Sequence, residues 1–530
     1  MPFGAWRNTP INLFREATMA LSSSQKNTFT LAAVCLAALM FGLEISSVPV
    51  ILPTLETVLR SNFRDLQWIM NAYTIACTTV LMATGTLADR YGRKRVFVGS
   101  LALFGMTSLA CGWADNANLL IAARFLQGMS GGAMLICQVA VLSHRFQGGA
   151  ARGKAFSAWG IVFGIGLGFG PIIGAAIVAV SSWQWVFLVH GPLAVLALGL
   201  VLAGVDESRD PARRKLDVLG IASLSLAVFG LAWYITQGPA LGFASAAAGA
   251  SLALAIAGFI VFVVAERRNP DPMFDFSVFR IRRFSGALLG SAGMNFSFWP
   301  FMIYLPLYFQ NGLGYTSLET GLALLAYTLP PLVVPPLAER LALRYRPDAV
   351  IPAGLFTIGL GFLLMKWGSG AAHASWLTML PGCLLAGMGL GLTNTPVTNT
   401  STGAVPGERA GMASGIDISA RMISLSINIA LMGFILVEGI LSSLRAQLPG
   451  LAPDGNQLRL MAENLSAGNS SAGAAVALPA HVAQAALAHG FGLLMLYGGI
   501  AVWLLAALSL LVFGVNRTSR ATAPLSQGSL

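Results

Sequence analysis

The 530-residue sequence predicts an all-α integral membrane protein with about fourteen transmembrane helices. Hydrophobic residues make up 56% of the chain and charged residues only 10%, whereas a soluble domain carries roughly 25% charged residues. The mean hydropathy is +0.72. Apolar runs long enough to cross a bilayer, which takes about 20 residues, recur along the whole chain. A chain of this composition needs lipid as its solvent.

The predicted spans follow from these apolar runs, many of which are rich in glycine, a residue that lets membrane helices pack closely. They cover residues 28–54, 66–88, 95–114, 118–143, 155–180, 184–205, 217–238, 243–265, 284–309, 317–338, 349–366, 374–396, 412–440 and 488–514.

The distribution of lysine and arginine supports this layout. Fourteen spans place both termini on one side, and 25 of the 32 basic residues then lie on that side, against five on the other. Basic loops mark the cytoplasmic face of a membrane protein. We therefore expect both termini in the cytoplasm and the chain in the plasma (inner) membrane. The net charge of +11 indicates contacts with anionic lipid, and no nucleic-acid partner is expected.

The segments outside the spans are polar. Residues 1–27 read as a cytoplasmic N-tail without a cleavable signal, and 515–530 as a C-tail. Residues 441–487 form a long loop on the outer side, rich in Ala, Ser, Gly and Asn. This loop is either a contact for a periplasmic adaptor protein or a tolerated insertion.

The segment between the second and third spans combines glycines, one carboxylate and several cations. It contains Gly85, Asp89, Arg90, Gly92 and Arg93. A carboxylate at a helix end can cap a neighbouring helix and pair with an arginine. Such a contact could latch one conformation; the alternative is a plain basic loop that sets topology.

Two charged residues lie within predicted spans of the first half. Arg124 is about two turns into its span, and Glu44 is the deep carboxylate of the first span. A charge in hydrocarbon costs several kcal/mol unless it faces a cavity or a partner. Glu44 therefore suits a proton carrier or a site for cationic substrates; the alternatives are a structural pairing for Glu44 and a surface-directed side chain for Arg124.

The fifth span repeats small residues every four positions. Gly166, Gly170 and Gly174, with Pro171, leave one helix face bare, which permits close helix contact and adds a bend. Further polar or aromatic residues within spans could line a cavity or join helices: Asn71, Gln127, Gln138, Asn295, Tyr304, Asn394 and Asn428. Asp417 and Arg421, four residues apart, can pair on one helix face.

We expect no nucleotide site and no metal site. We therefore expect no cofactor and no enzymatic activity. Residues 148–155 resemble a phosphate-binding loop but lack its Ser or Thr. The five cysteines lie within apolar runs, where they read as small buried hydrophobes.

The stretch from Gly85 to Lys94 matches the signature loop of the major facilitator superfamily, and the chain resembles that superfamily's fourteen-helix drug:H⁺ antiporter family. The resemblance implies that Gly85, Asp89, Arg90, Gly92 and Arg93 form a cytoplasmic latch. The stretch around Arg124 resembles the fourth-helix motif, whose arginine takes part in proton coupling.

Two further motifs of the resemblance depart slightly from the family pattern. The run from Gly166 to Gly174 resembles the antiporter motif, with Ala175 in place of its last glycine. Glu44 stands where fourteen-helix relatives usually carry Asp, and His190 where they typically carry Asn. His190 could titrate near neutral pH or simply replace that Asn as a polar group.

The resemblance implies two pseudo-symmetric six-helix bundles, at 28–205 and 284–514, with two inserted linker helices and basic loops at 206–283. It implies a proton-coupled exporter of amphipathic small molecules or drugs that works by alternating access. Glu44 would exchange the proton, and Arg124 would tune the pKa of Glu44. A dedicated exporter of one metabolite, such as a siderophore or an aromatic acid, is the alternative.

Overall fold

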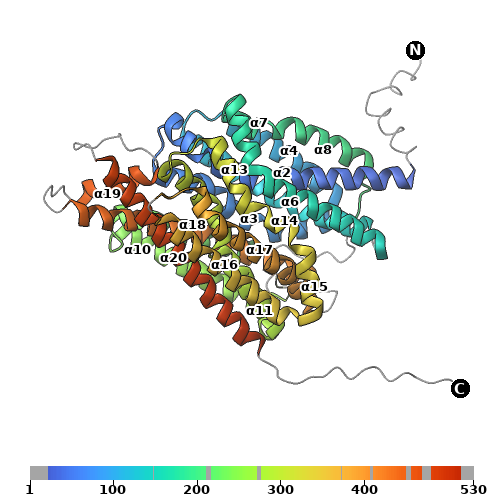
Figure 1. The fold of residues 1–530 in the computed structure, drawn as a ribbon. Coiled ribbons are helices and arrows are strands. Elements are labelled where there is room, and N and C mark those ends of the chain that lie inside the picture. Colours follow the sequence, from blue (N-terminus) through green and yellow to red (C-terminus); the bar gives the residue numbers. More distant parts are fainter. Residues whose placement is uncertain are drawn as a thin grey trace, which may run out of the picture.

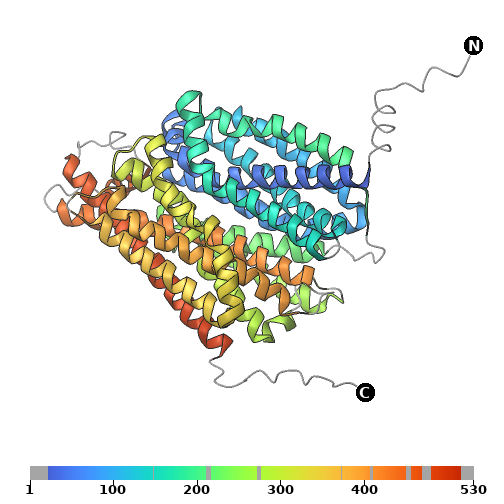
Figure 2. The same cartoon turned by 45° about the vertical axis from the view of Figure 1, so that its right-hand side comes forward.

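The computed structural model describes residues 22–514 except 147–148, 210–216, 271, 273–275, 372, 406–409, 449–454 and 468–478. Every regular element in the described residues is a helix. The helices form two groups that lie side by side (Figures 1 and 2).

The first group is built from the N-terminal helices. It contains α2 (Ser23–Leu59), α3 (Phe63–Tyr91), α4 (Arg93–Gly112), α5 (Ala117–Arg145), α6 (Gly149–Val180), α7 (Gln184–Leu188) and α8 (His190–Gly204). Within it α2 packs against α6 and α8, and α5 packs against α3 and α4. Side-chain caps fix several helix starts. Asn62, for example, accepts a hydrogen bond from the backbone of Asp65 and forms a capping box with it.

The second group is built from the C-terminal helices. It contains α11 (Arg282–Asn295), α12 (Phe298–Leu307), the π-helical turn η2 (Tyr308–Gly312), α13 (Ser317–Thr328), α14 (Pro330–Val333), α15 (Pro335–Tyr345), α16 (Pro347–Ser369), α17 (Trp376–Gly403), α18 (Ala410–Gln447), α19 (Gly455–Ala467) and α20 (Ala480–Phe513). Here α16 packs against α17 and α20, and α11 packs against α17 and α20.

Two helices connect the groups in the sequence. They are α9 (Val218–Leu241) and α10 (Ala246–Arg268), which pair with each other and precede the short 3₁₀ helix η1 (Phe276–Arg280). α9 contacts α3 of the first group and α18 of the second. Glycine allows the pairing: a Cβ on Gly230 would lie 2.9 Å from the Ser251 carbonyl oxygen, and one on Gly258 equally close to that of Ser223.

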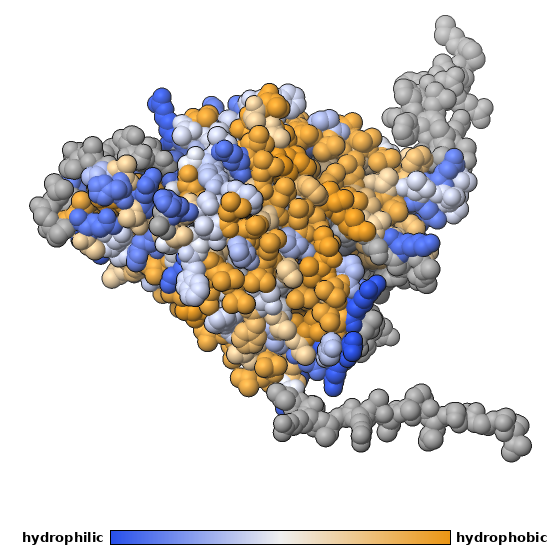
Figure 3. Space-filling view, in the orientation of Figure 1, coloured by the Kyte–Doolittle hydropathy of each residue, from blue (hydrophilic) through white to orange (hydrophobic). Residues whose placement is uncertain are grey.

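Among the described residues, twelve helical stretches are long and apolar enough to cross a membrane. The other two predicted spans correspond to α3 and to the pair α11–α12. α3 has 29 residues but a polar face, whereas the stretch 284–309 is broken at Phe296 and Ser297, where α11 ends and α12 begins. Apolar side chains cover the middle of the surface and polar ones gather toward its ends (Figure 3), as expected of a protein that spans a bilayer.

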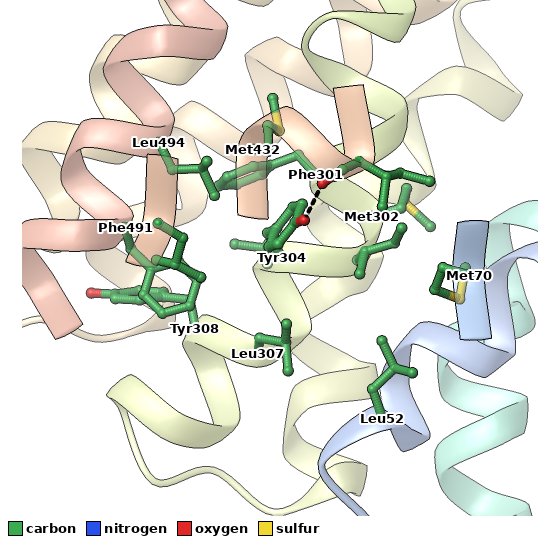
Figure 4. Packing of buried hydrophobic residues seen from close by; sticks show 14 of the residues in the cluster. Leu52, Met70, Phe301, Met302, Tyr304, Leu307, Tyr308, Met432, Phe491 and Leu494 are labelled. Atoms are coloured by element: carbon green, nitrogen blue, oxygen red, sulfur yellow. Dashed lines mark hydrogen bonds between the residues drawn. The ribbon is translucent and has the colours of Figure 1, made fainter. Parts of the chain in front are cut away.

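The two groups meet toward one end of the molecule. We call this the α19 end, and the opposite end, where α2 begins and α20 ends, the terminal end. A buried apolar cluster joins α2 and α3 to α12, α18 and α20 at the α19 end; Leu52 and Met70 face Met302 and Leu307 in Figure 4. Toward the terminal end the groups diverge (Figure 2).

Candidate functional site

A cluster of ionisable side chains lies buried inside the first group. Glu44 on α2, Arg124 on α5 and His190 at the start of α8 are at most 1% exposed. Arg124 Nη1 donates a hydrogen bond to Glu44 Oε1 in an ion pair and another, 2.7 Å long, to Gln127 Oε1. Its Nε donates to the Ile69 carbonyl oxygen at 3.2 Å. The predicted charges of two separate spans therefore pair with each other.

Close helix packing brings the guanidinium to this position. A Cβ on Gly128 would lie 2.3 Å from the backbone oxygen of Tyr73, so only glycine lets α5 approach α3 this closely. The Tyr73 ring then lies under the guanidinium, 4.3 Å from its carbon to the ring centroid, a cation–π arrangement. Gln127 is held in turn by a 2.8 Å hydrogen bond to Ser108 on α4.

The cluster is not fully satisfied by its partners. Glu44 Oε2 and Arg124 Nη2 are buried without a hydrogen-bond partner in the described residues. His190 Nδ1 lies 3.6 Å from that free carboxylate oxygen. Breaking a buried ion pair typically costs about 3–5 kcal/mol because one charge is left uncompensated. A change in the protonation of Glu44 is therefore a strong local perturbation.

The predicted latch segment lies where α3 gives way to α4, at the terminal end. Gly92 connects the helices with φ +114°, a conformation that favours glycine. The Glu207 carboxylate, just after α8, accepts a 3.1 Å hydrogen bond from the backbone N–H of Lys94, and the N–H of Arg93 donates to the Ser208 carbonyl at 3.0 Å. These contacts join the latch segment to the part of the chain that directly follows α8.

Three other residues of the predicted latch lie in α3 or follow it. Gly85 is half-buried and Arg90 is exposed, with its guanidinium 5.5 Å from the Tyr91 ring centroid. Asp89 belongs to α3, but its side chain lies outside the described part of the structure. The latch role of these residues therefore stays a prediction.

A second ionic cluster at the terminal end was missed by the sequence reasoning. Asp206 accepts 2.9 Å hydrogen bonds from Lys26 on α2 and Arg145 on α5. Partial burial acts to raise the pKa of the Asp206 carboxyl, but its hydrogen bond to Lys26 and the positive charges of Lys26, Arg145 and Lys94 lower that pKa below its usual value overall. The basic loop pattern gave no sign of this acidic partner.

The glycines of α6 serve two helix interfaces. A Cβ on Gly166 would lie 2.8 Å from the Leu39 backbone oxygen, and Gly170 and Gly174 equally leave room for Ser46 and Ser47 of α2. The predicted bare face therefore packs on α2. A 3.0 Å hydrogen bond from the Ser46 hydroxyl to the Gly166 carbonyl oxygen joins the two helices there.

A different face of α6 meets the second group. Leu332 fills the space beside Gly164 and Gly168, and Thr328 donates a 2.6 Å hydrogen bond to the Gly168 carbonyl. Pro171 lies where Gly321 of α13 approaches. The helix with the antiporter-like pattern is thus part of the contact between the two groups.

The residues predicted to line a cavity are buried in this conformation, except Asn394, which is half-buried. The Asn71 amide has no hydrogen-bond partner in the described residues, whereas Gln127 belongs to the Arg124 cluster. Gln138 accepts a 2.9 Å hydrogen bond from Trp159, and Asn295 donates to the Ser291 carbonyl at 2.8 Å. Tyr304 donates to the Ile429 carbonyl at 2.5 Å (Figure 4). Their role as cavity lining stays a prediction.

The second group has its own partly buried ion pair. Arg421 contacts Asp417 on α18 at 3.0 Å, the pairing that their spacing predicts. Asp417 also accepts a hydrogen bond from Ser291 on α11, and Arg421 donates to Asn394 and Thr398 on α17. The pair therefore joins three helices of the second group.

At the α19 end one ion pair connects the two groups and another holds α19 on α18 within the second group, and sequence reasoning predicted neither of them. Glu463 on α19 pairs with Arg64 on α3 at 2.8 Å, and Arg459 pairs with Glu438 on α18 at 2.8 Å. Gln310 of η2 donates a 2.9 Å hydrogen bond to the Val50 carbonyl of α2. The predicted outer loop therefore contains a helix docked across the junction.

Comparison with known proteins agrees with this architecture. Residues 34–428 match the model of the Major Facilitator Superfamily. The chain is 32% identical to the multidrug resistance protein Stp of Mycobacterium tuberculosis over 82% of this chain and 80% of that protein. It is 30% identical to the tetracenomycin C resistance and export protein of Streptomyces glaucescens, over 78% of this chain and 76% of that one.

Solved structures show the same fold at low sequence identity. A bacterial homologue of the human drug peptide transporters PepT1 and PepT2 superposes with a TM-score of 0.57, covering 92% of this chain and 98% of that one at 14% identity. A D-xylose–proton symporter gives 0.56, with 83% and 96% covered at 14% identity. The chain is a multi-pass membrane protein and belongs to the major facilitator superfamily.

Proposed function

We propose that this protein exports amphipathic small molecules across the plasma membrane in exchange for protons. The observation that carries the proposal is the fully buried Glu44–Arg124 ion pair, a protonatable carboxylate inside the membrane region of a transporter. Relatives named for multidrug resistance and for tetracenomycin C export support the class of substrate.

The arrangement of the helices suits alternating access. We assign the first group (28–205) and the second group (284–514) as the two moving bundles and 206–283 as the linker. The excess of basic residues puts the terminal end in the cytoplasm, with both termini there. The bundles meet at the α19 end, where Glu463 pairs with Arg64, so we assign this conformation as closed toward the outside.

The proton would act through the buried pair. Ionised Glu44 compensates the charge of Arg124; a proton on Glu44 removes that compensation. Arg124 then needs another partner, which favours a different packing of α2 against α5. In this account the contacts of α6 with both groups transmit the change, because α6 packs on α2 through Gly166, Gly170 and Gly174. Gly85, Asp89, Arg90, Gly92 and Arg93 would latch the opposite conformation.

The substrate would bind between the bundles when the structure rearranges. We assign Asn71, Tyr304, Gln127, Gln138 and Asn295 to that surface. Both amide atoms of Asn71 lack a hydrogen-bond partner among the described residues, and Tyr304 lies at the junction of α12 with α18. Loop 441–487 presents α19 at the outer surface, where a periplasmic adaptor protein would have access to it.

The test uses inverted membrane vesicles with an acidic interior and a fluorescent dye that reports the proton gradient. Puromycin and tetracenomycin C are added separately, because the chain is similar to the puromycin resistance protein pur8 of Streptomyces alboniger and to the tetracenomycin C resistance and export protein. We expect at least one compound to discharge the gradient with wild type and neither to do so with Glu44→Gln. Glu319→Gln is the matched control, since Glu319 caps α13 at the surface and Gln can fill the same capping role.

Two results would count against the proposal. Discharge that persists in Glu44→Gln would remove Glu44 from proton coupling. Failure of both compounds and of a broad amphipathic panel with wild type would replace the multidrug function by export of one dedicated metabolite.

A further inference from the structure

His190 lies in the buried cluster, and the mechanism above does not use it. It is the first residue of α8, directly after Val189, where the chain passes from α7 to α8. The ring is 1% exposed and lies edge-on to Phe104, 5.6 Å between centroids. A buried imidazole in this position needs a partner for each of its polar atoms.

Both ring nitrogens of His190 face hydrogen-bond acceptors. Nδ1 lies 3.3 Å from the Phe187 carbonyl oxygen, and Nε2 lies 3.2 Å from the Met40 carbonyl oxygen. Neutral imidazole carries one N–H, so one nitrogen would then present a lone pair to a carbonyl oxygen. Only the imidazolium, with two N–H groups, can donate to both.

A third acceptor lies on the Nδ1 side. Glu44 Oε2, which has no hydrogen-bond partner in the described residues, is 3.6 Å from Nδ1. Glu44 Oε1 meanwhile accepts from Arg124. The two oxygens of one carboxylate thus face two different basic side chains.

The other ionisable groups around this cluster come from the neighbouring helices. Arg124 on α5 supplies a fixed positive charge, and Glu44 on α2 supplies the negative charge. Tyr73 on α3 and Cys111 on α4 interact electrostatically with Glu44 and Arg124. Among these described groups, Glu44 and His190 are the carboxylate and the imidazole that face each other, with Oε2 and Nδ1 3.6 Å apart.

We propose that His190 is a second proton-holding residue of the coupling site, a role that rests on the proposed function. A proton bound to Glu44 moves to His190: the O–H bond at Oε2 breaks, the N–H bond at Nδ1 forms, and Nε2–H continues to donate to Met40. The products are a carboxylate and an imidazolium, and the net charge of the cluster is unchanged.

This transfer explains how the protein can carry a proton in the present conformation. The Glu44–Arg124 pair stays intact while His190 holds the proton. Release toward the cytoplasm returns His190 to its neutral form.

The direct test is NMR of the full-length protein in lipid, with ¹⁵N-labelled histidine. The chain has five histidines, and the spectrum of His190→Asn identifies the His190 signal by subtraction. Between about pH 5 and about pH 8, where histidine changes charge, we expect His190 to show a form with both ring nitrogens protonated. The signal of this form should change in Glu44→Gln. One neutral tautomer throughout that range would overturn the proposal.

A transport measurement separates this inference from the proposed function. The pH profile of dye-reported proton exchange, with puromycin as the probe, is compared for wild type, His190→Asn and His190→Gln, each checked for wild-type thermal stability. We expect the pH profile of each variant to show one ionisation fewer than the profile of wild type. An unchanged profile with an active wild type would refute the role of His190 alone. An inactive wild type would refute puromycin–proton exchange, and the NMR result would then decide the role of His190.

Discussion

At the residue scale, Arg124 organises the buried site through its planar guanidinium. It reaches Glu44, Gln127 and the Ile69 carbonyl at once while it lies over the Tyr73 ring. Lysine offers a point charge on a flexible stem and cannot reproduce this set of contacts. The residue therefore fixes α2, α3 and α5 relative to one another.

A pH-dependent contribution to stability is expected from Asp206. Its lowered pKa means that the folded protein gains from the ionised carboxylate above the usual aspartate pKa, about 4. This gain disappears as the pH falls through the lowered pKa. Asp206→Asn should lower stability at pH 7 by less than about 1 kcal/mol, because the side chain is half-exposed.

The measurement is thermal unfolding of wild type and Asp206→Asn across this pH range. The two melting temperatures should converge in acid. A difference that stays constant down to acid pH would contradict the role of the ionised group.

The single residues of the site could be predicted, but their pairing could not. Glu44 and Arg124 stand out because charge is costly in an apolar run. They are 80 positions apart, and nothing in either span tells which other span it packs against. Asp206 and Glu463 looked like ordinary loop residues because their partners come from distant helices.

At the element scale, α6 depends on glycine where it touches α2. In Gly166→Ala the new Cβ would lie 2.8 Å from the Leu39 oxygen and 3.1 Å from the Leu43 nitrogen. Both atoms are backbone and cannot move aside independently. We expect a loss of about 1–3 kcal/mol of stability from this overpacking.

Gly160→Ala on the same helix is the matched control, because a Cβ there has no neighbour within 4 Å. This change should be neutral or slightly stabilising. Unfolding can be followed by the reaction of a thiol dye with Cys77, Cys111, Cys137 and Cys383, all buried in the folded protein. Equal melting temperatures for the two variants would mean that the α2–α6 contact is not tight.

The long apolar helices follow directly from composition, whereas their interruptions do not. Residues 317–338 read as one span but form α13, α14 and the start of α15, because prolines 330, 331, 335 and 336 remove backbone donors. The stretches 184–205 and 284–309 are likewise each divided in two. Hydropathy reports how apolar a segment is and says little about where its backbone bends.

At the scale of the whole molecule, the ion pair between Arg64 and Glu463 joins the two groups across the α19 end. Glu463→Gln should weaken this junction and shift the population toward a form open at that end. Gln310 donates a hydrogen bond across the junction to the Val50 carbonyl. In Gln310→Cys, the reaction of the new thiol with a membrane-impermeant maleimide reports the opening. The background has the five native cysteines replaced by alanine.

We expect Glu463→Gln to increase the labelling rate at least about fivefold, because typical coupling between sites begins near that factor. Leu460→Ala, an exposed position on the same helix, is the control and should leave the rate unchanged. Equal rates for the two variants would show that α19 does not hold the junction closed.

The membrane fold follows from composition and from the signature segments, because both can be read directly from the sequence. The bounds of the two bundles stay a prediction. The docking of α19 and the meeting of the groups at one end are long-range properties. They depend on whether contact between the groups is more stable at the α19 end or at the terminal end. The pattern of apolar and basic residues is compatible with both arrangements.

The central claim is that Glu44 couples proton entry to export. The most direct measurement uses purified protein in liposomes with an imposed pH gradient and labelled puromycin, comparing wild type with Glu44→Gln. We expect uphill puromycin movement against the proton flow with wild type and none with Glu44→Gln. Uphill movement of equal size in both proteins would contradict it.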